Sequence, residues 1–366
     1  MSKDPNNGAI MSDIYSNNPK DIYLVTPDLS DDNILGYAVG LRPFRKSGIR
    51  IEPEYLKNKL LIHNYGYAAS GLTLCLGGAQ EVIQLLRKEE SYNAKFAAPQ
   101  AIAILGAGVI GLSAAYELLA EGYNVNIYAD EFTPNLTSNV AAGILSVPSP
   151  QSGELASQKE LLNRIVNISL QRFEACLVDE EPEFMGINLL MDYRFEVPSD
   201  KIDLSNKFKD FSSEEEDVRV HFDTGLVKVG KRAECLGLDG KLFMDDLLSQ
   251  VKSRGAVIHK KHFKNKNDVE ALEENIIINC TSMGSQNIFD DHEFMPVRGH
   301  LIYFKLQVGM NYSMYQPVPQ HTDYWVKLYP WHDRLILGGV FEQGVNECIQ
   351  DKNVINTLLK YARACL

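Results

Sequence analysis

The sequence predicts an α/β protein, and three observations carry this prediction. Strand-like and helix-like segments alternate at both ends of the 366-residue chain, which is typical of α/β folds. A strand, a glycine turn, a helix and a second strand follow one another from Ala101 to Asp130. The chain is 45% hydrophobic and long enough for one large domain or two ordinary ones.

Charge and cysteine content exclude several classes of partner. The net charge is −12 and no basic face is evident, so we expect neither nucleic acid nor an anionic membrane as a partner. No apolar run approaches the roughly 20 residues of a membrane span, and the first residues lack a signal-peptide core. The six cysteines lie far apart without a CxxC pair, which favours a reducing cytoplasm.

Individual elements are predicted from local patterns. A helix-like segment (77–86) is followed by a polar stretch ending in proline (87–100), which we interpret as a linker. Residues 241–255 read as a helix closed by a glycine turn, and "NIIINC" (275–280) as a buried strand. "RLILGGVFE" (334–342) is another apolar strand, whereas the middle third of the chain is mixed.

The glycine turn has the G-x-G-x-x-G spacing of a dinucleotide site. The first glycine allows a tight turn, the second lets backbone approach a pyrophosphate, and the third lets the helix pack on the strand. The helix N-terminus then presents N–H groups to the phosphates. Asp130, at the end of the next strand, suits a ribose hydroxyl; the bland alternative is a packing turn with a plain strand-end acid. The predicted cofactor contacts here are Gly106, Gly108, Val109, Ile110, Gly111 and Asp130.

The segment after this acid favours a flavin over a nicotinamide cofactor. "FTPNLTSNVAAGIL" (132–145) runs from threonine and serine into small residues, whose backbone can lie against a flat ring system. The predicted contacts in this segment are Thr137, Ser138, Ala141, Ala142 and Gly143.

Four segments carry a resemblance to the D-amino acid oxidase family of FAD-dependent enzymes. "IYADEFTPNLTSNVAAG" (127–143) is very similar to that family's Y-A-D-x-F-T-P…V-A-A-G run. "IIINCTS" (276–282), "PVRGHLIYF" (296–304) and "LILGGVF" (335–341) resemble three further family strands. The resemblance implies an FAD-binding Rossmann-like domain and a substrate domain built on a mixed sheet.

Two further family blocks lie on the unexpected side of the glycine turn. "GLRPFRKSGIRIEP" (40–53) and "LIHNYGYAASGLTLCLGGAQEVIQLL" (61–86) resemble segments that the family carries near its C-terminus. We therefore interpret the chain as a circular permutation, with 87–100 joining the family's end to its start; completion of a second copy by residues 1–90 is the alternative. The implied domains are 44–157 plus 240–290 for FAD, and 1–43 plus 158–239 plus 291–366 for substrate and interface.

The resemblance also implies site residues. Arg42 matches the family's carboxylate-binding arginine, and the carbonyl of Ala69 matches a glycine carbonyl that accepts the substrate amine. The helix opened by Ser70, Gly71, Leu72 and Thr73 would place its N–H groups at the flavin edge. Taken alone, Arg42 could equally be a structural arginine, His63 a satisfied core histidine, and the "HKKH" run (259–262) a solvated turn.

The chain departs from the family at the substrate pocket. Ala68 and Ala69 stand where the family usually has glycines. Anchored on Pro330, the family's two pocket tyrosines correspond to Asp323 and Lys327, and Tyr329 shares a strand face with Lys327. We expect Lys327 to pair with Asp323 or with a second substrate carboxylate, and Lys327 and Tyr329 to act beside Arg42 and Ala69.

These features predict oxidation of a D-amino acid to a 2-oxo acid, ammonia and hydrogen peroxide, with D-amino acid and oxygen as small-molecule partners. A flavin dehydrogenase, an oxidase of glycine or secondary amino acids, and a flavin-binding protein without turnover are the alternatives. A cytoplasmic protein without a metal site is expected, and a homodimer is left open.

Overall fold

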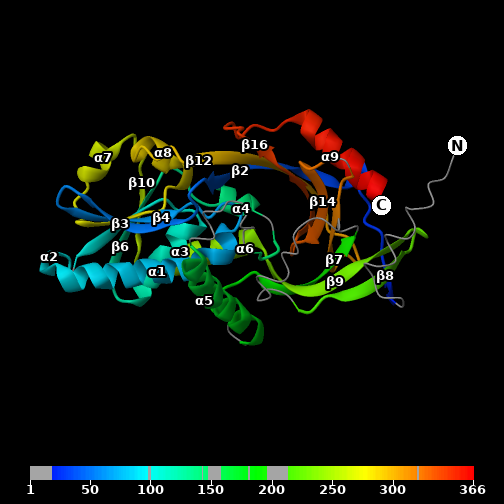
Figure 1. Ribbon diagram of the computed structural model, residues 1–366, viewed down its shortest axis with the longest axis horizontal. Helices are drawn as coiled ribbons and strands as arrows, with labels where there is room; N and C mark the ends of the chain where they lie inside the picture. The colour runs from blue at the N-terminus through cyan, green and yellow to red at the C-terminus, as the bar shows by residue number, and fades with distance from the viewer. Residues whose placement is uncertain are drawn as a thin grey trace.

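The protein is built around two β-sheets that lie side by side (Figure 1). The computed structural model describes residues 19–97, 100–141, 143–146, 158–179, 182–195, 213–319 and 321–366. Within these ranges the smaller sheet has six strands and the larger sheet ten. The predicted α/β class is confirmed.

The smaller sheet has the arrangement of a nucleotide-binding fold. Five neighbouring strands are parallel, and β3 runs antiparallel at one edge. In spatial order the strands are β10 (Val257–Lys260), β6 (Asn124–Ala129), β5 (Ala101–Leu105), β11 (Ile276–Asn279), β4 (Lys59–Tyr65) and β3 (Arg50–Leu56). The central strands β5 and β11 are almost entirely apolar, as expected of parallel strands covered on both faces.

Alternate residues of these strands enter two separate cores. Leu60, Ile62 and Ile104 face a core formed with α1 (Gly71–Tyr92), α3 (Val109–Ala120), α5 (Lys159–Val178) and α6 (Gly240–Ser253). Leu61 and Ile277 face the second core, beside α7 (Lys266–Glu270) and α8 (Ser285–Ile288). This alternation is the period-2 pattern of a strand buried on both faces.

Helix α1 lies very close to α5. A Cβ on Gly77 would be 2.1 Å from the carbonyl oxygen of Ile165, so only glycine permits this approach. The Gly77 amide also donates to Ser169 Oγ at 2.9 Å. The first helix of the chain is therefore an integral part of the nucleotide-binding half.

The larger sheet carries most of the second half of the molecule. Its path contains β1 (Lys20–Leu24), β8 (Glu216–Phe222), β9 (Val227–Leu238), β7 (Ile187–Phe195), β13 (Tyr312–Pro317), β14 (Tyr324–Pro330), β15 (Arg334–Val340), β12 (Phe294–Lys305) and β16 (Glu342–Gln343). The long strand β2 (Ile34–Arg45) pairs antiparallel with β12. The shorter elements are η1 (Asp31–Asn33), α2 (Ala94–Ala97), α4 (Thr137–Val140) and η4 (Ser282–Gly284).

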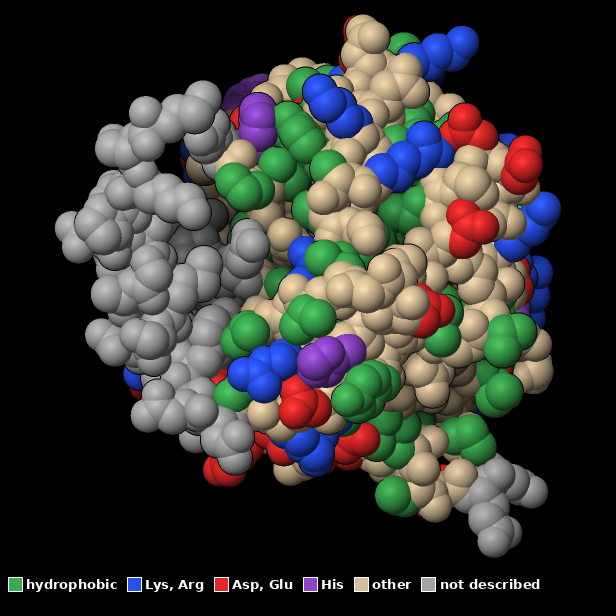
Figure 2. Space-filling model, turned by 90° about the vertical axis from the view of Figure 1, so that its right-hand side faces the viewer, with side chains coloured by type: hydrophobic (Ala, Val, Ile, Leu, Met, Phe, Trp, Pro, Cys, Tyr) green, Lys and Arg blue, Asp and Glu red, His purple; other side chains and the backbone are tan. Residues whose placement is uncertain are grey.

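The C-terminal helix α9 (Lys352–Cys365) packs on β14, β12 and β15 and ends beside the first described residues. Arg363 donates to the carbonyl of Leu29 at 2.9 and 2.7 Å. On the face shown in Figure 2, acidic and basic side chains of the described residues are interspersed. This face offers no extended basic surface among those residues.

The predicted linker is partly helical. Helix α1 continues to Tyr92, and α2 occupies Ala94–Ala97. Lysine, arginine and glutamate at 87–90 are good helix formers, and Arg87 pairs with Glu121 on the neighbouring chain segment. The helix therefore extends beyond the predicted helix-like segment 77–86 into the first part of the predicted linker.

We expect a fragment beginning at residue 100 to be unable to fold. It would lack β3, β4 and α1, and β11 would lose the strand that pairs along one of its two edges. All seven residues of β4 are buried in the whole protein. Circular dichroism and flavin content of the purified 100–366 fragment test this expectation, and a folded fragment that retains flavin would make the N-terminal part an accessory.

Candidate active site

Each of the three positions of the turn has a different reason for carrying glycine. Gly106 has a φ of +102°, and a Cβ there would lie 2.5 Å from the carbonyl oxygen of Cys280. A Cβ on Gly111 would lie 2.0 Å from the carbonyl oxygen of Gly106. Gly108 is different, because its Cβ would meet only Ser138 Oγ, at 3.5 Å. The fold requires the first and third glycines, whereas the space at Gly108 remains open toward a ligand.

Two helix N-termini meet beside this turn. Gly108 is the N-cap of α3 and supplies no side-chain cap, and the Val109 amide donates to Ser138 Oγ at 3.1 Å. A Cβ on Gly71, at the start of α1, would lie 3.6 Å from Val109 and 3.9 Å from Ile110. Two positive helix ends at one place form a binding site for an anionic group such as a pyrophosphate.

The predicted positions at the start of α1 lie around this junction. Ser70 is the N-cap, and its amide donates to the Tyr67 carbonyl at 2.9 Å. Thr73 Oγ1 accepts the Ser146 amide at 3.1 Å, which ties α1 to the segment after α4. Leu72 is buried in the adjoining core.

Ala68 and Ala69 form the turn before this helix. Ala68 has a φ of +52°, a conformation that favours glycine and costs an alanine about 1–2 kcal/mol. Ala69 is exposed at the tip of the turn. The turn therefore keeps the shape that a glycine pair would adopt, although the chain has alanines there.

The segment with small residues (132–145) contains α4 and packs against the larger sheet. A Cβ on Gly40 of β2 would lie 3.4 Å from Thr137 and 3.2 Å from Val140, so α4 rests on the backbone of β2. The Gly143 carbonyl accepts the Leu238 amide at 2.7 Å. Ala141 is half-buried and extended, and Ala142 lies outside the described residues.

Asp130 follows β6 and is exposed, as a ribose contact requires. His262 Nδ1 lies 2.8 Å from Asp130 Oδ2. Because β10 pairs in parallel with β6, Lys260 lies opposite Ala129. His262 follows Lys260 by two residues, and Asp130 follows Ala129, so the two side chains meet at the ends of these strands. The sequence analysis did not find this residue, because it interpreted the "HKKH" run as a solvated turn.

Arg42 lies on β2 as a half-buried cation. Its Nη1 donates to the Val340 carbonyl at 2.9 Å, and its guanidinium lies 2.6–2.8 Å from where a Cβ of residue 299 would be. Burial lowers the pKa of the Arg42 guanidinium. Within the described part of the chain, no carboxylate lies within 4.0 Å of it. A desolvated arginine without a counter-ion can bind an anionic ligand.

Tyr329 and Trp331 occupy the same region. Tyr329 interacts electrostatically with Arg42, and burial raises its pKa well above the usual range. A Cβ on Gly143 would lie 2.8 Å from the Tyr329 ring and 3.4 Å from Trp331 Nε1. The structure thus brings Arg42, Tyr329 and the predicted flavin-facing segment together.

Lys327 has a partner that the sequence analysis did not find. Its Nζ lies 2.6 Å from Asp192 Oδ1, and Asp192 is only 1% exposed. Asp192 lies on β7, which is paired with β13, the strand beside β14. The expected pairing with Asp323 is wrong, because Lys327 pairs instead with this buried carboxylate two strands away in the same sheet.

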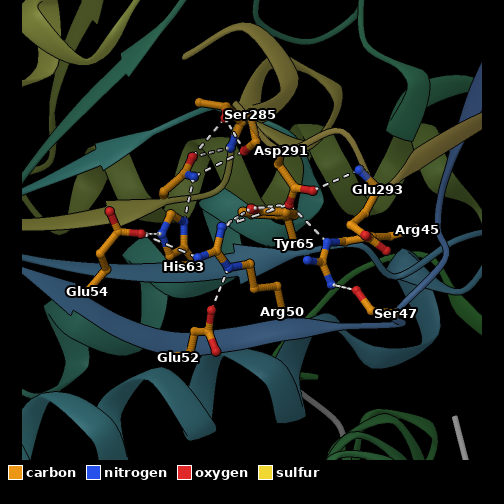
Figure 3. A network of polar contacts seen from close by, with 12 residues as sticks. Arg45, Ser47, Arg50, Glu52, Glu54, His63, Tyr65, Ser285, Asp291 and Glu293 are labelled. Carbon is orange, nitrogen blue, oxygen red and sulfur yellow. Dashed lines mark hydrogen bonds and ion pairs between the residues drawn. The ribbon is translucent and has the colours of Figure 1, made fainter. Parts of the chain in front are cut away.

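A polar network anchors the end of β4 (Figure 3). His63 Nε2 lies 3.0 Å from Glu54 Oε2, and His63 Nδ1 lies 3.0 Å from Asn279 Nδ2. Tyr65 donates to Asp291 at 2.7 Å, and Arg45 pairs with the same carboxylate at 2.9 Å. These contacts connect β3 and β4 to residues 279–291. His63 is wholly buried within them, as a core histidine would be.

This network predicts acid sensitivity. Burial lowers the pKa of His63 from its ordinary value near 6.5 to about 4. The unfolded chain takes up a proton below pH 6.5 that the folded protein refuses until about pH 4. As the pH falls from about 6.5 to about 4, His63 should therefore lower the free energy of unfolding by about 1.4 kcal/mol per pH unit. Urea unfolding at several pH values tests this, and a His63→Gln variant with the same slope as the wild type would contradict it.

Comparison with known protein families gives a match over most of the chain. A family model described as FAD dependent oxidoreductase (DAO) matches residues 101–366. The D-amino-acid oxidase of Dictyostelium discoideum is 27% identical over 55% of this chain and 56% of its own length. The D-amino acid oxidase of Dugesia ryukyuensis is 24% identical over 72% of this chain and 77% of its own length. The chain thus matches little more than half of the Dictyostelium enzyme.

The solved structures agree in fold. Glycine oxidase from Bacillus cereus superposes with a TM-score of 0.51 at 15% identity, covering 72% of this chain and 78% of that enzyme. None of the helices in the described ranges combines the length and apolar character needed to cross a membrane.

Proposed function

Because this chain belongs to the FAD dependent oxidoreductase (DAO) family, we propose that it oxidises a D-amino acid to a 2-oxo acid, ammonia and hydrogen peroxide. The observation that carries the proposal is Arg42, a cation without a carboxylate partner among the described residues. Tyr329 connects Arg42 to the nucleotide site, because it interacts electrostatically with Arg42 and lies against Gly143 of the small-residue segment. The relatives from Dictyostelium and Dugesia that carry this activity in their names support the same substrate class.

FAD, on which the family depends, fits the residues present. The open space over Gly108 and the two uncapped helix N-termini suit a pyrophosphate. We assign the phosphates to Gly106, Gly108, Val109, Ile110 and Gly111, and the ribose to Asp130. We assign the ring system to Thr137, Ser138, Ala141, Ala142, Gly143 and to the helix start at Ser70, Gly71, Leu72 and Thr73.

FAD bound there would supply the electron acceptor for oxidation of the substrate carbon, with oxygen as the proposed final acceptor. The chain's own groups hold the substrate for this step. Arg42 binds the α-carboxylate through two N–H groups, and the exposed carbonyl of Ala69 accepts a hydrogen bond from the amine. The Tyr329 ring covers Gly143 and keeps water from this face. No side-chain base is required, because the amine can lose its proton to solvent.

A second candidate is oxidation or dehydrogenation of glycine or a secondary amino acid. Arg42 would serve any amino carboxylate, and the superposition on glycine oxidase supports the fold that such an enzyme needs. A flavin-binding protein without turnover is the third candidate. Its support is Lys327, which stands in place of a pocket tyrosine and is already paired with Asp192.

Two measurements distinguish the three candidate functions. Purified protein is first examined for a flavin absorbance spectrum, and its bleaching by D-amino acids, glycine and N-methyl amino acids is then followed without oxygen. Oxygen consumption with the same panel identifies the electron acceptor. Bleaching by glycine or secondary amines alone favours the second candidate. A yellow protein that no amino acid bleaches overturns both enzyme proposals.

We also propose that the chain order is a circular permutation of the family order. Support comes from the family match, which starts at β5, and from β4, which pairs with β11 in the same sheet. The contact between Arg363 and Leu29 is compatible with a direct connection from the last helix to the segment that begins near Leu29. A reordered chain that starts at residue 101 and ends at residue 92 should fold and bind FAD. A control opened inside β4 should not, and failure of both would contradict the permutation.

We propose that residues 44–157 and 240–290 form the FAD-binding domain around the smaller sheet. Residues 1–43, 158–239 and 291–366 would form the substrate and interface domain around the larger sheet. We propose a cytoplasmic location, supported by six cysteines that are all free. Cell fractionation tests the location, and light scattering of the purified protein decides whether a homodimer forms.

A further inference from the structure

Two buried hydrogen-bond donors, on Tyr329 beside Arg42 and on Trp331, have no partner in the part of the chain that the structure describes. Tyr329 is 2% exposed and Trp331 5% exposed. Among the residues that the structure describes, neither the Tyr329 hydroxyl nor Trp331 Nε1 has a hydrogen-bond partner. A buried donor that stays unpaired costs free energy, so such groups usually mark a place that a ligand fills.

Both donors belong to one apolar wall. Tyr329, Trp331 and Ile336 form a small cluster, against which Leu301 and Tyr303 pack. Gly143 lies against both rings, since its missing Cβ would be 2.8 Å from Tyr329 and 3.4 Å from Trp331. A pocket with apolar walls and a few polar groups is typical of a site that reads a small molecule.

The charges around this wall are already paired. Lys327 is held by Asp192 at 2.6 Å. Arg334, whose guanidinium lies 4.9 Å from the Tyr303 ring centre, is held by Asp333 at 2.7 Å. In the proposed function, Arg42 is taken by the α-carboxylate of the substrate. A second substrate carboxylate would therefore find no free cation among the described residues here, and burying it unpaired is costly.

The hydrogen-bonding capacity of the two residues is specific. An indole N–H can only donate, whereas a phenol can donate or accept. A primary amide presents one carbonyl oxygen and one NH₂ group, which match these two residues. A carboxylate has only acceptors, and an alkyl side chain leaves both donors unpaired.

We propose that Tyr329 and Trp331 recognise an uncharged amide at the end of the substrate side chain, so that the enzyme prefers D-asparagine or D-glutamine. This inference rests on the proposed function, and it replaces the second substrate carboxylate that was considered as a partner of Lys327. Sites built to hydrogen-bond a polar group discriminate strongly against analogues that lack it, because the groups of the site are then left unpaired.

The test uses side chains of equal shape. D-asparagine, D-aspartate and D-leucine differ in polarity but hardly in size, and D-glutamine and D-glutamate extend the comparison by one carbon. We expect anaerobic flavin reduction to be at least about tenfold more efficient with the better amide than with its acid or D-leucine. Tyr329→Phe and Trp331→Phe should each remove about tenfold of the amide preference. Trp325→Phe, on the same strand, is the matched control and should keep the preference.

A binding experiment separates this inference from the proposed function. Succinamate, succinate and 4-methylpentanoate are the corresponding carboxylates without the amine, and they bind without being oxidised. Shifts of the flavin absorbance give their Kd values, and succinamate should bind tightest to the wild type but not to either variant. Equal binding, or tightest binding of succinate, overturns the inference. If the variants change the flavin spectrum without ligand and leave the ranking intact, the donors serve the cofactor and the inference is also overturned. Absence of bleaching by every amino acid would instead refute the proposed function, while the ranking of the three carboxylates still decides the inference.

Discussion

Arg42→Leu should lower kcat/KM for every amino acid substrate by roughly a factor of 10²–10³. This factor corresponds to a loss of about 3–4 kcal/mol of transition-state stabilisation. The variant loses a charge-assisted bidentate contact in a desolvated place, where few other groups can replace it. Flavin content should remain that of the wild type, because Arg42 lies on β2 and not on either helix N-terminus. Steady-state kinetics normalised to bound flavin measure the effect.

The same variant should not lose stability. Arg42 has no carboxylate partner among the described residues, so an apolar replacement removes a buried cation without leaving an unpaired acid. Arg298→Leu is the matched control, since Arg298 is bound to Glu342 through two nitrogens at 2.9 and 2.8 Å and should destabilise the protein when lost. A destabilised Arg42→Leu protein with normal turnover per bound flavin would make Arg42 a structural residue.

Gly108→Val should purify as a folded protein without flavin. The protein itself has space there, because a Cβ would meet only Ser138 Oγ at 3.5 Å, an ordinary van der Waals distance. The branched side chain would instead occupy the volume that the pyrophosphate needs. The ratio of flavin to protein absorbance gives cofactor content, and circular dichroism gives the folded state.

Gly111→Ala provides the contrast to this prediction. Its Cβ would lie 2.0 Å from the Gly106 carbonyl oxygen, so this variant should lose stability as well as flavin. A Gly108→Val protein that retains full flavin would show that the pyrophosphate lies elsewhere.

The sequence predicted the parts of the site that depend on local pattern. The glycine spacing, the acid after β6 and the apolar strand at 276–279 each follow from neighbouring residues. The placement of 61–86 in the same half of the molecule as 101–105, with β11 between β4 and β5, came from the order of the family's motifs and not from any local signal.

The missed features depend on contacts between distant segments. Asp192 reaches Lys327 only because β7 and β13 are parallel neighbours. His262 reaches Asp130 through the β10–β6 pairing, and the unpaired Trp331 Nε1 becomes visible only when burial is known. The helical start of 87–100 could have been predicted from its residue types, but its mixed charge was interpreted as a linker.

The pairing of the early strand β4 with the late strand β11 determines when the protein can fold as it is synthesised. His63 and Asn279 are hydrogen-bonded neighbours at the ends of these strands, yet 216 residues separate them along the chain. On the ribosome, a strand whose seven residues are all buried in the folded protein and a long helix therefore emerge well before the strand β11 that pairs with β4. Contacts of such large sequence separation form slowly, and an unpaired apolar strand is open to aggregation in the meantime. The nascent chain is therefore exposed to aggregation, or to chaperone binding, until residues 276–279 have been made.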